Sequence, residues 1–524
     1  MTEIGRGAEL RVADVVRARA AQRPDTVAVR QGDHELTYGL LDQRSSRLAQ
    51  ALLASGVCAG SRVAYLDRSA PEIVELLFAA SKIGAVTVPL NWRLTAPEMR
   101  GVLADSQAPL LLVGSVYEEL AEEVVAGLSP APAVIHVADG YERWLAAFDA
   151  VDPATSSTSG DVVLQLYTSG TTGVPKGVLM THENLAACAE TSPYWQFDAD
   201  TISLTPLPMF HIGGIGWAFL GLWNGATTIL VREFVPEEIL ELLERARVTN
   251  AIFVPTMLQM LSAVPGAADR DYTALRSIAY GASPITTPVL KAALRTFRCS
   301  LYGVYGLTES TGGVVQLDPE DHDPDGPREH LLRSAGRPLP WVQLRVVDPA
   351  DGRELAPGQV GEVWLRAPNV TPGYFNRPDE TAAALTPDGW LRTGDGGYVD
   401  KEGYLFLTDR IKDMIVSGGE NVYPIEVEET LAQHPDVLDV TVIGIPDDRW
   451  GEAVKALVIR RSGSTATADE LIAFARKRLA GYKLPRSIEF VDELPRTPSG
   501  KVLKRELRER HRAASSLTLY SHPG

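Results

Sequence analysis

The stretch YTSGTTGVPKGV, residues 167–178, concentrates residue types that bind phosphate. Its three glycines and Pro175 disfavour both helix and strand, because these residues weaken both kinds of element. A loop of this composition instead presents backbone N–H groups and hydroxyls beside one cation, Lys176. That arrangement is suited to a polyphosphate. A flexible surface turn is the alternative interpretation of this stretch taken alone.

The order of residues differs from that of the common nucleoside-triphosphatase loop. That loop reads G-x-x-x-x-G-K-[ST] and leads into a helix, whereas Lys176 is followed by Gly177. The segments DVVLQLY (161–167) and GVLMTH (177–182), on either side of the loop, both have the character of strands. We therefore expect a strand–loop–strand phosphate site, which the rest of the chain must identify.

Further short segments carry side chains that can do chemistry. Glu309 offers the hard oxygen ligands that suit Mg²⁺ beside phosphates, and Tyr305 offers a ring that can stack on a base. Asp395 can accept hydrogen bonds from ribose hydroxyls. His211 and Lys501 both lie beside glycine turns; taken alone, each is more often a packing or surface residue. The segments are PMFHIGG (208–214), YGLTES (305–310), RTGD (392–395), TDRIKD (408–413) and RTPSGKVLKREL (496–507).

Alternating helices and strands must position these segments. A helix is predicted within residues 36–57, a strand at 61–67, a second helix at 71–84 and a strand from residue 86. The same rhythm recurs around 236–263 and 284–302, which indicates largely parallel sheets covered on both faces.

The pattern of predicted helices and strands changes twice towards the C-terminus. From about residue 335, short strands are separated by Asp-Gly and Pro-Gly turns, which indicates a β-rich subdomain over 335–410. After residue 411 the pattern is helix (425–433), strand (437–445), strand (453–460) and helix (468–479). We therefore predict an α/β protein with an N-terminal domain, residues 1–410, of two parallel-rich sheets plus the β-rich subdomain. A small mobile α+β domain, residues 411–524, follows it.

Composition excludes several classes of protein. The chain has 524 residues and a net charge of −17, which argues against a nucleic-acid partner because such a protein needs a basic surface. Its three cysteines lie far apart, which indicates a reducing, cytoplasmic location without a disulfide framework. The apolar stretch 213–231 is divided by Asn224 and Gly225 into a helix-like and a strand-like half, each too short to cross a bilayer. No integral membrane segment is expected.

Together and in this order, the segments strongly resemble the adenylate-forming superfamily, which includes acyl-CoA synthetases, nonribosomal-peptide adenylation domains and firefly luciferase. The resemblance covers roughly residues 10 to 510 and rests on YTSGTTGVPKGV, YGLTE, RTGD, DRIKD, SGGENVYP and PRTPSGKVLK. It implies an enzyme that uses ATP, Mg²⁺ and CoA to activate a carboxylic acid as an acyl-adenylate. Its partners would then be these small molecules, with a homodimer left open.

The resemblance also implies a role for each matching residue. Lys501, Glu309, Thr168 and His211 would be catalytic, Glu309 and Thr168 would hold Mg²⁺, and Lys501 would neutralise charge between the carboxylate and the α-phosphate. Residues of the ATP site would be Thr168, Ser169, Gly170, Thr171, Thr172, Lys176, Gly281, Ala282, Ser283, Tyr305, Gly306, Thr308, Glu309, Asp395, Arg410 and Lys501.

Residues for the later, thiol-dependent step follow from the same resemblance. Lys412 would be the hinge about which the C-terminal domain rotates, and Gly419 would line the CoA tunnel.

The acyl pocket implied by the resemblance would include His211, Gly213, Gly214 and Trp217. The glycines of this segment, including Gly216, would leave room for the acyl group.

The acid is predicted from the residues that would line its pocket. No charged residue occurs from Ile212 to Val231, and Glu309 is the one charged residue between Gly303 and Leu317. Burying an unpaired second charge of the substrate there costs several kcal/mol, which argues against diacids and amino acids. A fatty or alkyl acid is the first choice and an aryl acid the alternative. A stand-alone adenylating enzyme and a luciferase-like monooxygenase on the same scaffold are further alternatives.

Overall fold

The computed structural model describes residues 10–155, 157–168, 175–283, 285–410, 413–417, 420–447, 450–497 and 502–518. Its first sheet has six strands in the order β6-β5-β3-β4-β7-β8, all parallel except for the β7–β8 hairpin. The strands are β3 (Arg62–Leu66), β4 (Val86–Pro89), β5 (Leu110–Val113), β6 (Ala133–His136), β7 (Val162–Thr168) and β8 (Lys176–Thr181). The helices of this region are α2 (Tyr38–Ala54), α3 (Pro71–Ile83), α4 (Ala96–Ser106), α5 (Glu118–Val125), α6 (Glu142–Ala146) and α7 (His182–Ala189).

A second, nine-stranded sheet has the order β15-β14-β13-β12-β11-β9-β10-β1-β2. Its centre, from β1 to β13, is parallel, while β2, β14 and β15 pair antiparallel at the two ends. The strands are β1 (Val27–Gln31), β2 (His34–Thr37), β9 (Ile202–Thr205), β10 (Thr227–Leu230), β11 (Asn250–Phe253), β12 (Ser277–Gly281), β13 (Ser300–Leu307), β14 (Gly312–Leu317) and β15 (Arg337–Pro338). Its helices are α1 (Val12–Gln22), α8 (Ile212–Asn224), α9 (Pro236–Arg245), α10 (Pro255–Ala263) and α11 (Thr287–Phe297).

The apolar stretch 213–231 is a buried helix followed by a buried strand, as predicted. Helix α8 ends at Gly225, whose φ of 75° is the left-handed conformation that glycine adopts without strain. Strand β10 then lies between β9 and β1 in the nine-stranded sheet. Among the residues that the structure describes, no helix is long and apolar enough to span a membrane.

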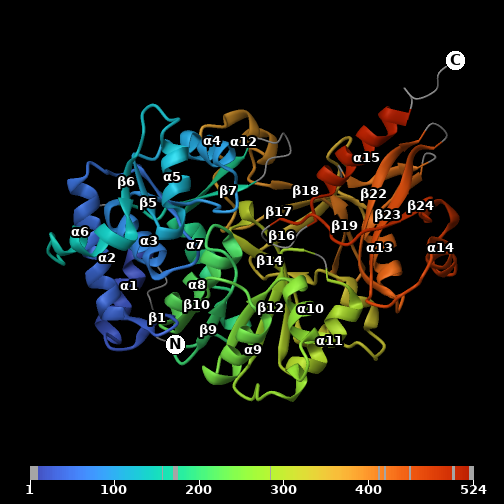
Figure 1. Ribbon diagram of the computed structural model, residues 1–524, viewed down its shortest axis with the longest axis horizontal. Helices are drawn as coiled ribbons and strands as arrows, with labels where there is room; N and C mark the ends of the chain where they lie inside the picture. Colours follow the sequence, from blue (N-terminus) through green and yellow to red (C-terminus); the bar gives the residue numbers. More distant parts are fainter. Residues whose placement is uncertain are drawn as a thin grey trace.

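The β-rich subdomain is a four-stranded antiparallel sheet, in agreement with the turn pattern. Its strands are β16 (Gln343–Val347), β17 (Gly361–Arg366), β18 (Leu391–Val399) and β19 (Leu405–Arg410), and α12 (Pro378–Ala384) lies between β17 and β18 in the chain. In Figure 1 these strands lie between the two large sheets and the C-terminal part of the molecule.

The C-terminal part is built on a separate five-stranded sheet. Its strands are β20 (Ile415–Ser417), β21 (Glu420–Val422), β22 (Val437–Asp447), β23 (Gly451–Arg460) and β24 (Ser487–Phe490); its helices are α13 (Pro424–Ala432), α14 (Ala468–Arg476) and α15 (Lys504–Thr518). This part, orange to red in Figure 1, lies beside the rest of the chain. Arg333 lies 3.7 Å from Glu429, and the Gln259 amide donates to Leu438 O at 3.1 Å. We keep residue 411 as the proposed domain boundary.

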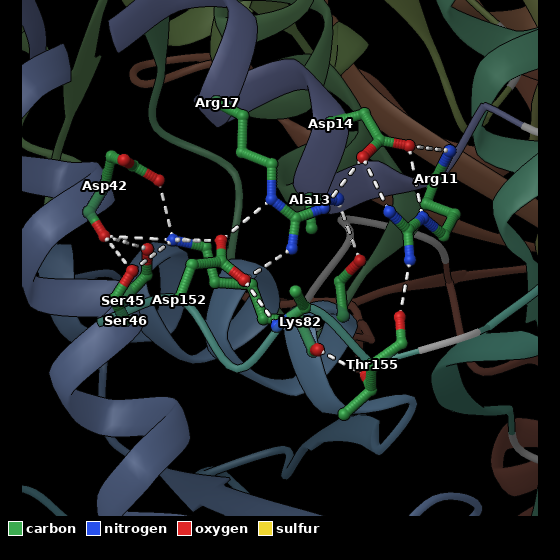
Figure 2. A network of polar contacts seen from close by, with 12 residues as sticks. Arg11, Ala13, Asp14, Arg17, Asp42, Ser45, Ser46, Lys82, Asp152 and Thr155 are labelled. Carbon is green, nitrogen blue, oxygen red and sulfur yellow. Dashed lines mark hydrogen bonds and ion pairs between the residues drawn. The ribbon is translucent and has the colours of Figure 1, made fainter. Parts of the chain in front are cut away.

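A polar network connects α1 to α2 and α3 (Figure 2). At its centre the ammonium of Lys82, completely buried, lies 2.6 Å from a carboxylate oxygen of Asp42 and 3.5 Å from one of Asp152. Arg17 of α1 pairs with both Asp152 and Asp14. Because Asp152 belongs to the segment that leads into β7, this network anchors the chain just before the predicted phosphate loop.

Candidate functional site

The predicted phosphate loop connects two antiparallel strands. Strand β7 ends at Thr168 and β8 begins at Lys176, and these two residues are partners in the ladder. The two predicted strands are therefore present on either side of residues 169–174. Ser169, Gly170, Thr171 and Thr172 of this loop lie outside the described residues.

Glu309 and Lys176 lie beside the same aromatic ring. Glu309 is in a short turn, Thr308–Ser310, after β13. The hydroxyl of Tyr374 donates to Glu309 Oε1 at 2.9 Å, and Lys176 Nζ lies 5.2 Å from the centre of the Tyr374 ring. The structure thus brings two residues predicted for the phosphate site together through a third residue that the sequence analysis did not single out.

The segment that contains Tyr374, residues 368–377, is bound to both sides of this site. Its backbone pairs with β8, since Leu179 N donates to Gly373 O at 3.0 Å and Phe375 N to Gly177 O at 2.8 Å. Thr371 N donates to the carbonyl oxygen of Glu309 at 2.8 Å. The sequence signal available beforehand was only a Pro-Gly turn before an aromatic pair, TPGYF, which by itself predicts a turn.

The residues predicted to bind the nucleoside lie at the end of β12, near the end of β13 and in the middle of β18. Tyr305 donates its hydroxyl to Asp395 Oδ2 at 2.8 Å, so these two residues meet although 90 positions separate them. Asp395 is the ladder partner of Arg410, whose side chain lies outside the described residues. Ala282, which follows β12 and precedes Ser283, has a φ of 67°, a conformation uncommon for a residue with a Cβ and worth note beside a site.

The glycines next to these residues allow two strands to approach closely. A Cβ at Gly281 would overlap the carbonyl oxygen of Val304, and one at Gly306 would overlap that of Gly312. Thr308 begins the turn that carries Glu309. The backbone around Tyr305 therefore has little room to rearrange, which makes it a rigid support for a bound base.

His211 is the residue immediately before α8, and its ring packs against Phe210 with centroids 4.5 Å apart. Burial and, to a smaller extent, the nearby Arg93 guanidinium lower the pKa of His211 to about 4. The imidazole is therefore neutral at pH 7. Its Nε2 atom is buried and has no hydrogen-bond partner among the described residues, so it is able to accept from or donate to a ligand.

The glycines after His211 do not leave the open space that the sequence indicated. A Cβ at Gly214 would overlap the carbonyl oxygen of Pro208, and one at Gly213 would lie 3.0 Å from Leu207 Cδ1. The chain itself occupies this room, because the start of α8 packs on the preceding turn. The acyl-pocket roles of Gly213 and Gly214 now rest on the family resemblance alone.

Trp217 of α8 is 2% exposed and belongs to the core between the two large sheets. Its ring packs against Trp195 and Phe197, with centroids 5.5 and 5.0 Å away. Its indole Nε1 is buried and has no hydrogen-bond partner among the residues that the structure describes. The helix predicted to line the acyl pocket therefore contributes one tryptophan, with an unsatisfied donor, to an aromatic cluster completed by Trp195 and Phe197.

Besides the four residues of the phosphate loop, three more predicted site residues fall outside the described residues: the catalytic Lys501, the hinge Lys412 and the tunnel residue Gly419. In the part of the chain that is described, no group of three or more His, Cys, Asp or Glu side chains is arranged to hold a metal ion. Because Mg²⁺ is commonly held by one or two carboxylates plus substrate phosphates, Glu309 stays the predicted carboxylate ligand.

Comparison with known proteins supports this interpretation. A family model described as AMP-binding enzyme matches residues 16–375, and one described as AMP-binding enzyme C-terminal domain matches residues 426–501. The chain is 41% identical over 497 residues to a fatty acid–[acyl-carrier-protein] ligase, ScoC, of Streptomyces coeruleorubidus. The match covers 94% of each of the two chains. It is also 41% identical to a feruloyl-CoA synthase of an Amycolatopsis species, covering 94% of this chain and 97% of the relative.

A solved structure of similar sequence has the same fold. The o-succinylbenzoate CoA synthetase MenE from Bacillus subtilis, in complex with its acyl-adenylate intermediate, superposes with a TM-score of 0.84. The two chains are 32% identical, and the match covers 96% of this chain and 99% of the synthetase.

Proposed function

The chain belongs to the AMP-binding enzyme family and is an AMP-forming acid–CoA ligase, and we propose that it acts on an uncharged carboxylic acid with an apolar tail. The observation that carries its ATP-dependent step is that Lys176 and Glu309 meet at Tyr374, while Tyr305, four positions from Glu309, meets Asp395. These are the residue types that the phosphates, the metal and the nucleoside of ATP require.

In the first half-reaction a carboxylate oxygen of the acid attacks the α-phosphorus of ATP. The bond from that phosphorus to the bridging oxygen breaks, and pyrophosphate leaves. Catalysis of such a step consists mainly of positioning and of neutralising charge on the phosphate oxygens. Thr168 and Lys176 would bind the β- and γ-phosphates, while Tyr305 and Asp395 would hold the nucleoside. Glu309 and Thr168 would hold Mg²⁺, which when bound neutralises phosphate charge.

In the second half-reaction the sulfur of the thiol attacks the acyl carbon of the adenylate, and AMP leaves. Lys501 would act only in the first half-reaction, and rotation of residues 411–524 about Lys412 would then open a path past Gly419. A long, flexible side chain with a compact charge suits a site that forms and then disperses. These three roles rest on the family resemblance.

The acid is proposed from the side chains around α8. Helix α8 carries no charged residue, and Trp217, Trp195 and Phe197 form an apolar aromatic cluster. A fatty or alkyl acid would be bound through apolar burial, at about 0.8 kcal/mol for each buried methylene group. An aryl acid is the second candidate. The aromatic cluster and the unpaired Trp217 Nε1 favour a ring with a polar substituent.

A panel of carboxylic acids, scored by pyrophosphate release with and without CoA, tests this proposal. We expect release that rises with alkyl chain length or with ring size, and a CoA thioester product formed in the dark. A preference for diacids or amino acids would contradict the proposed acid. Pyrophosphate release without a thioester would identify a stand-alone adenylating enzyme, and light or oxidised product would identify a luciferase-like monooxygenase.

Lys501→Ala separates the two half-reactions. We expect it to abolish pyrophosphate release while sparing thioester formation from supplied acyl-AMP, because the lysine would belong to only one domain orientation. Equal loss of both half-reactions would remove Lys501 from the proposed role.

A further inference from the structure

The segment 368–377 contacts several parts of the site, and the mechanism above gives it no role. It pairs with β8 through Gly373 and Phe375, and Thr371 holds the backbone of Glu309. Asn369 donates to Ser310 O at 2.7 Å, and Arg377 pairs with Asp105. Asp105 in turn accepts a hydrogen bond of 2.8 Å from Tyr167, the residue just before Thr168.

Within this segment the position of Tyr374 is determined by its own backbone. Tyr374 is the bridge partner of Val178, and its N–H donates to Thr381 Oγ1 of α12 at 3.0 Å. The preceding Gly373 has a φ of 142°, and a Cβ there would lie 2.5 Å from Thr381 Cγ2. The backbone of Tyr374 is therefore held by β8 on one side and by Thr381 on the other, which fixes the position from which the ring extends into the site.

Two contacts of the Tyr374 side chain, with Glu309 and with Lys176, are different in kind. Its hydroxyl donates to one oxygen of Glu309, which restricts rotation of the carboxylate and directs the second oxygen away from the ring. Its ring face lies 5.2 Å from the ammonium of Lys176, within range of a cation–π contact. Lys176 forms no ion pair with any described residue, so the ring is the contact that holds its charge before a phosphate binds.

We propose that Tyr374 is a positioning residue of the adenylation step: its hydroxyl orients the Glu309 carboxylate for the metal, and its ring holds Lys176 for the phosphates. This inference rests on the proposed function. It also means that one side chain sets the distance between the cation and the carboxylate that act on the same phosphate chain.

Two substitutions separate the two contacts. Tyr374→Phe removes the hydroxyl and keeps the ring, so we expect the Mg²⁺ concentration for half-maximal pyrophosphate release to rise about tenfold. At saturating Mg²⁺ its KM for ATP should stay within about twofold of the parent. Tyr374→Leu removes both contacts and should also raise the KM for ATP, about threefold to fivefold. Thioester formation from supplied acyl-AMP should be unchanged in both variants, because acyl-AMP lacks the β- and γ-phosphates.

A matched control is available in the same chain. Tyr141 donates its hydroxyl to the buried carboxylate of Glu75 at 2.7 Å, in the α2–α3 region. Tyr141→Phe therefore removes the same kind of hydrogen bond, and it should leave the Mg²⁺ requirement unchanged. A double-mutant cycle of Tyr374→Phe with Glu309→Gln sharpens the test. If the hydroxyl acts through Glu309, adding Tyr374→Phe to the Glu309→Gln variant changes its Mg²⁺ requirement by less than about twofold.

The proposal is overturned if Tyr374→Phe keeps the parental Mg²⁺ requirement, if Tyr141→Phe shifts it equally, or if the two changes of the cycle are fully additive. It is also overturned if thioester formation from acyl-AMP falls as far as pyrophosphate release. Tyr374→Phe carries the test of the hydroxyl by itself if Tyr374→Leu does not fold. Absence of pyrophosphate release by the parent enzyme with every acid would instead reject the proposed function.

Discussion

Lys82 and Lys176 occupy two polar regions of the same domain that differ in what surrounds the charge. The ammonium of Lys82 is completely buried and hydrogen-bonds to Asp42 Oδ1 at 2.6 Å, to Asp42 O at 2.9 Å and to Ser46 Oγ at 2.7 Å (Figure 2). Lys176 is only partly buried, and its described contact is the face of Tyr374.

The difference separates a structural charge from one available to a ligand. A buried ammonium is stable only when its donors are fully paired, and such a group has no remaining capacity to bind substrate. An aromatic ring attracts a cation without neutralising it, so Lys176 keeps a full charge for phosphate. The partners of a lysine, and not the lysine itself, therefore distinguish the two regions.

The largest effect should come from the structural region. Lys82→Met leaves Asp42 and Ser46 without the ammonium, and we expect the free energy of unfolding to fall by about 3–4 kcal/mol. The KM for ATP of the folded fraction should be unchanged. Urea unfolding followed by tryptophan fluorescence, together with steady-state kinetics, measures both quantities. If Lys82→Met has the parental stability and a raised KM for ATP, Lys82 and Lys176 do not differ in the way proposed here.

Protonation of His182 should weaken the same region. Its Nδ1 accepts from Val12 N at 3.1 Å and so anchors α1. Burial lowers the pKa of His182 from an ordinary value of 6.5 to about 4. The unfolded chain therefore binds the proton first, and stability present above pH 6.5 is lost progressively as the pH falls towards 4, by up to about 3 kcal/mol.

Unfolding measured between pH 4 and 7 in the parent and in His182→Gln tests this sign. The variant should have a flatter pH dependence over that range, because it lacks the titrating imidazole. Parallel curves for the two proteins would show that other groups account for the acid sensitivity.

Lys176→Met should give the complementary result to Lys82→Met. We expect pyrophosphate release per enzyme to fall about 100-fold, because a charge that stabilises the phosphates is lost. The free energy of unfolding should change by less than about 0.5 kcal/mol, because no described ion pair is broken. Binding of acyl-AMP, measured by calorimetry, should be nearly unaffected. Equal weakening of ATP and acyl-AMP binding would make Lys176 structural as well.

The smallest effect should come from the nucleoside side of the site. Tyr305→Phe keeps the ring for stacking and removes the hydrogen bond from its hydroxyl to Asp395. We expect the KM for ATP to rise about fivefold, with the Mg²⁺ requirement unchanged. A changed Mg²⁺ requirement would mean that the nucleoside and phosphate sides of the site are not separable.

Much of the fold was predictable because the signals are local. The split of 213–231 followed from Asn224 and Gly225, and the helix beginning at Pro71 from its position in the first turn and the stop at Gly84. Likewise, the segments on either side of residues 169–174 were predicted to be strands, as β7 and β8 are. In each case the residues that determine the backbone conformation lie within a few positions of one another.

The sequence predicted which residues belong to the site better than it predicted which of them contact one another. The sequence motifs selected Lys176, Glu309, Tyr305 and Asp395, but gave no indication that Tyr374 links the first two. Gly214 was interpreted as open space, whereas the turn at Pro208 occupies it. A missing side chain in the sequence does not reveal whether substrate or backbone takes its place.

By itself, then, the sequence determined the local elements, the chemical types of the site residues and the family. The tertiary structure alone decided which lysine is neutralised and which stays available, and that 65 positions separate Glu309 from the tyrosine that orients it. The physical reason is that a backbone conformation depends on neighbours in the chain. The charge, the hydrogen bonding and the accessibility of a side chain depend instead on segments that only folding brings together.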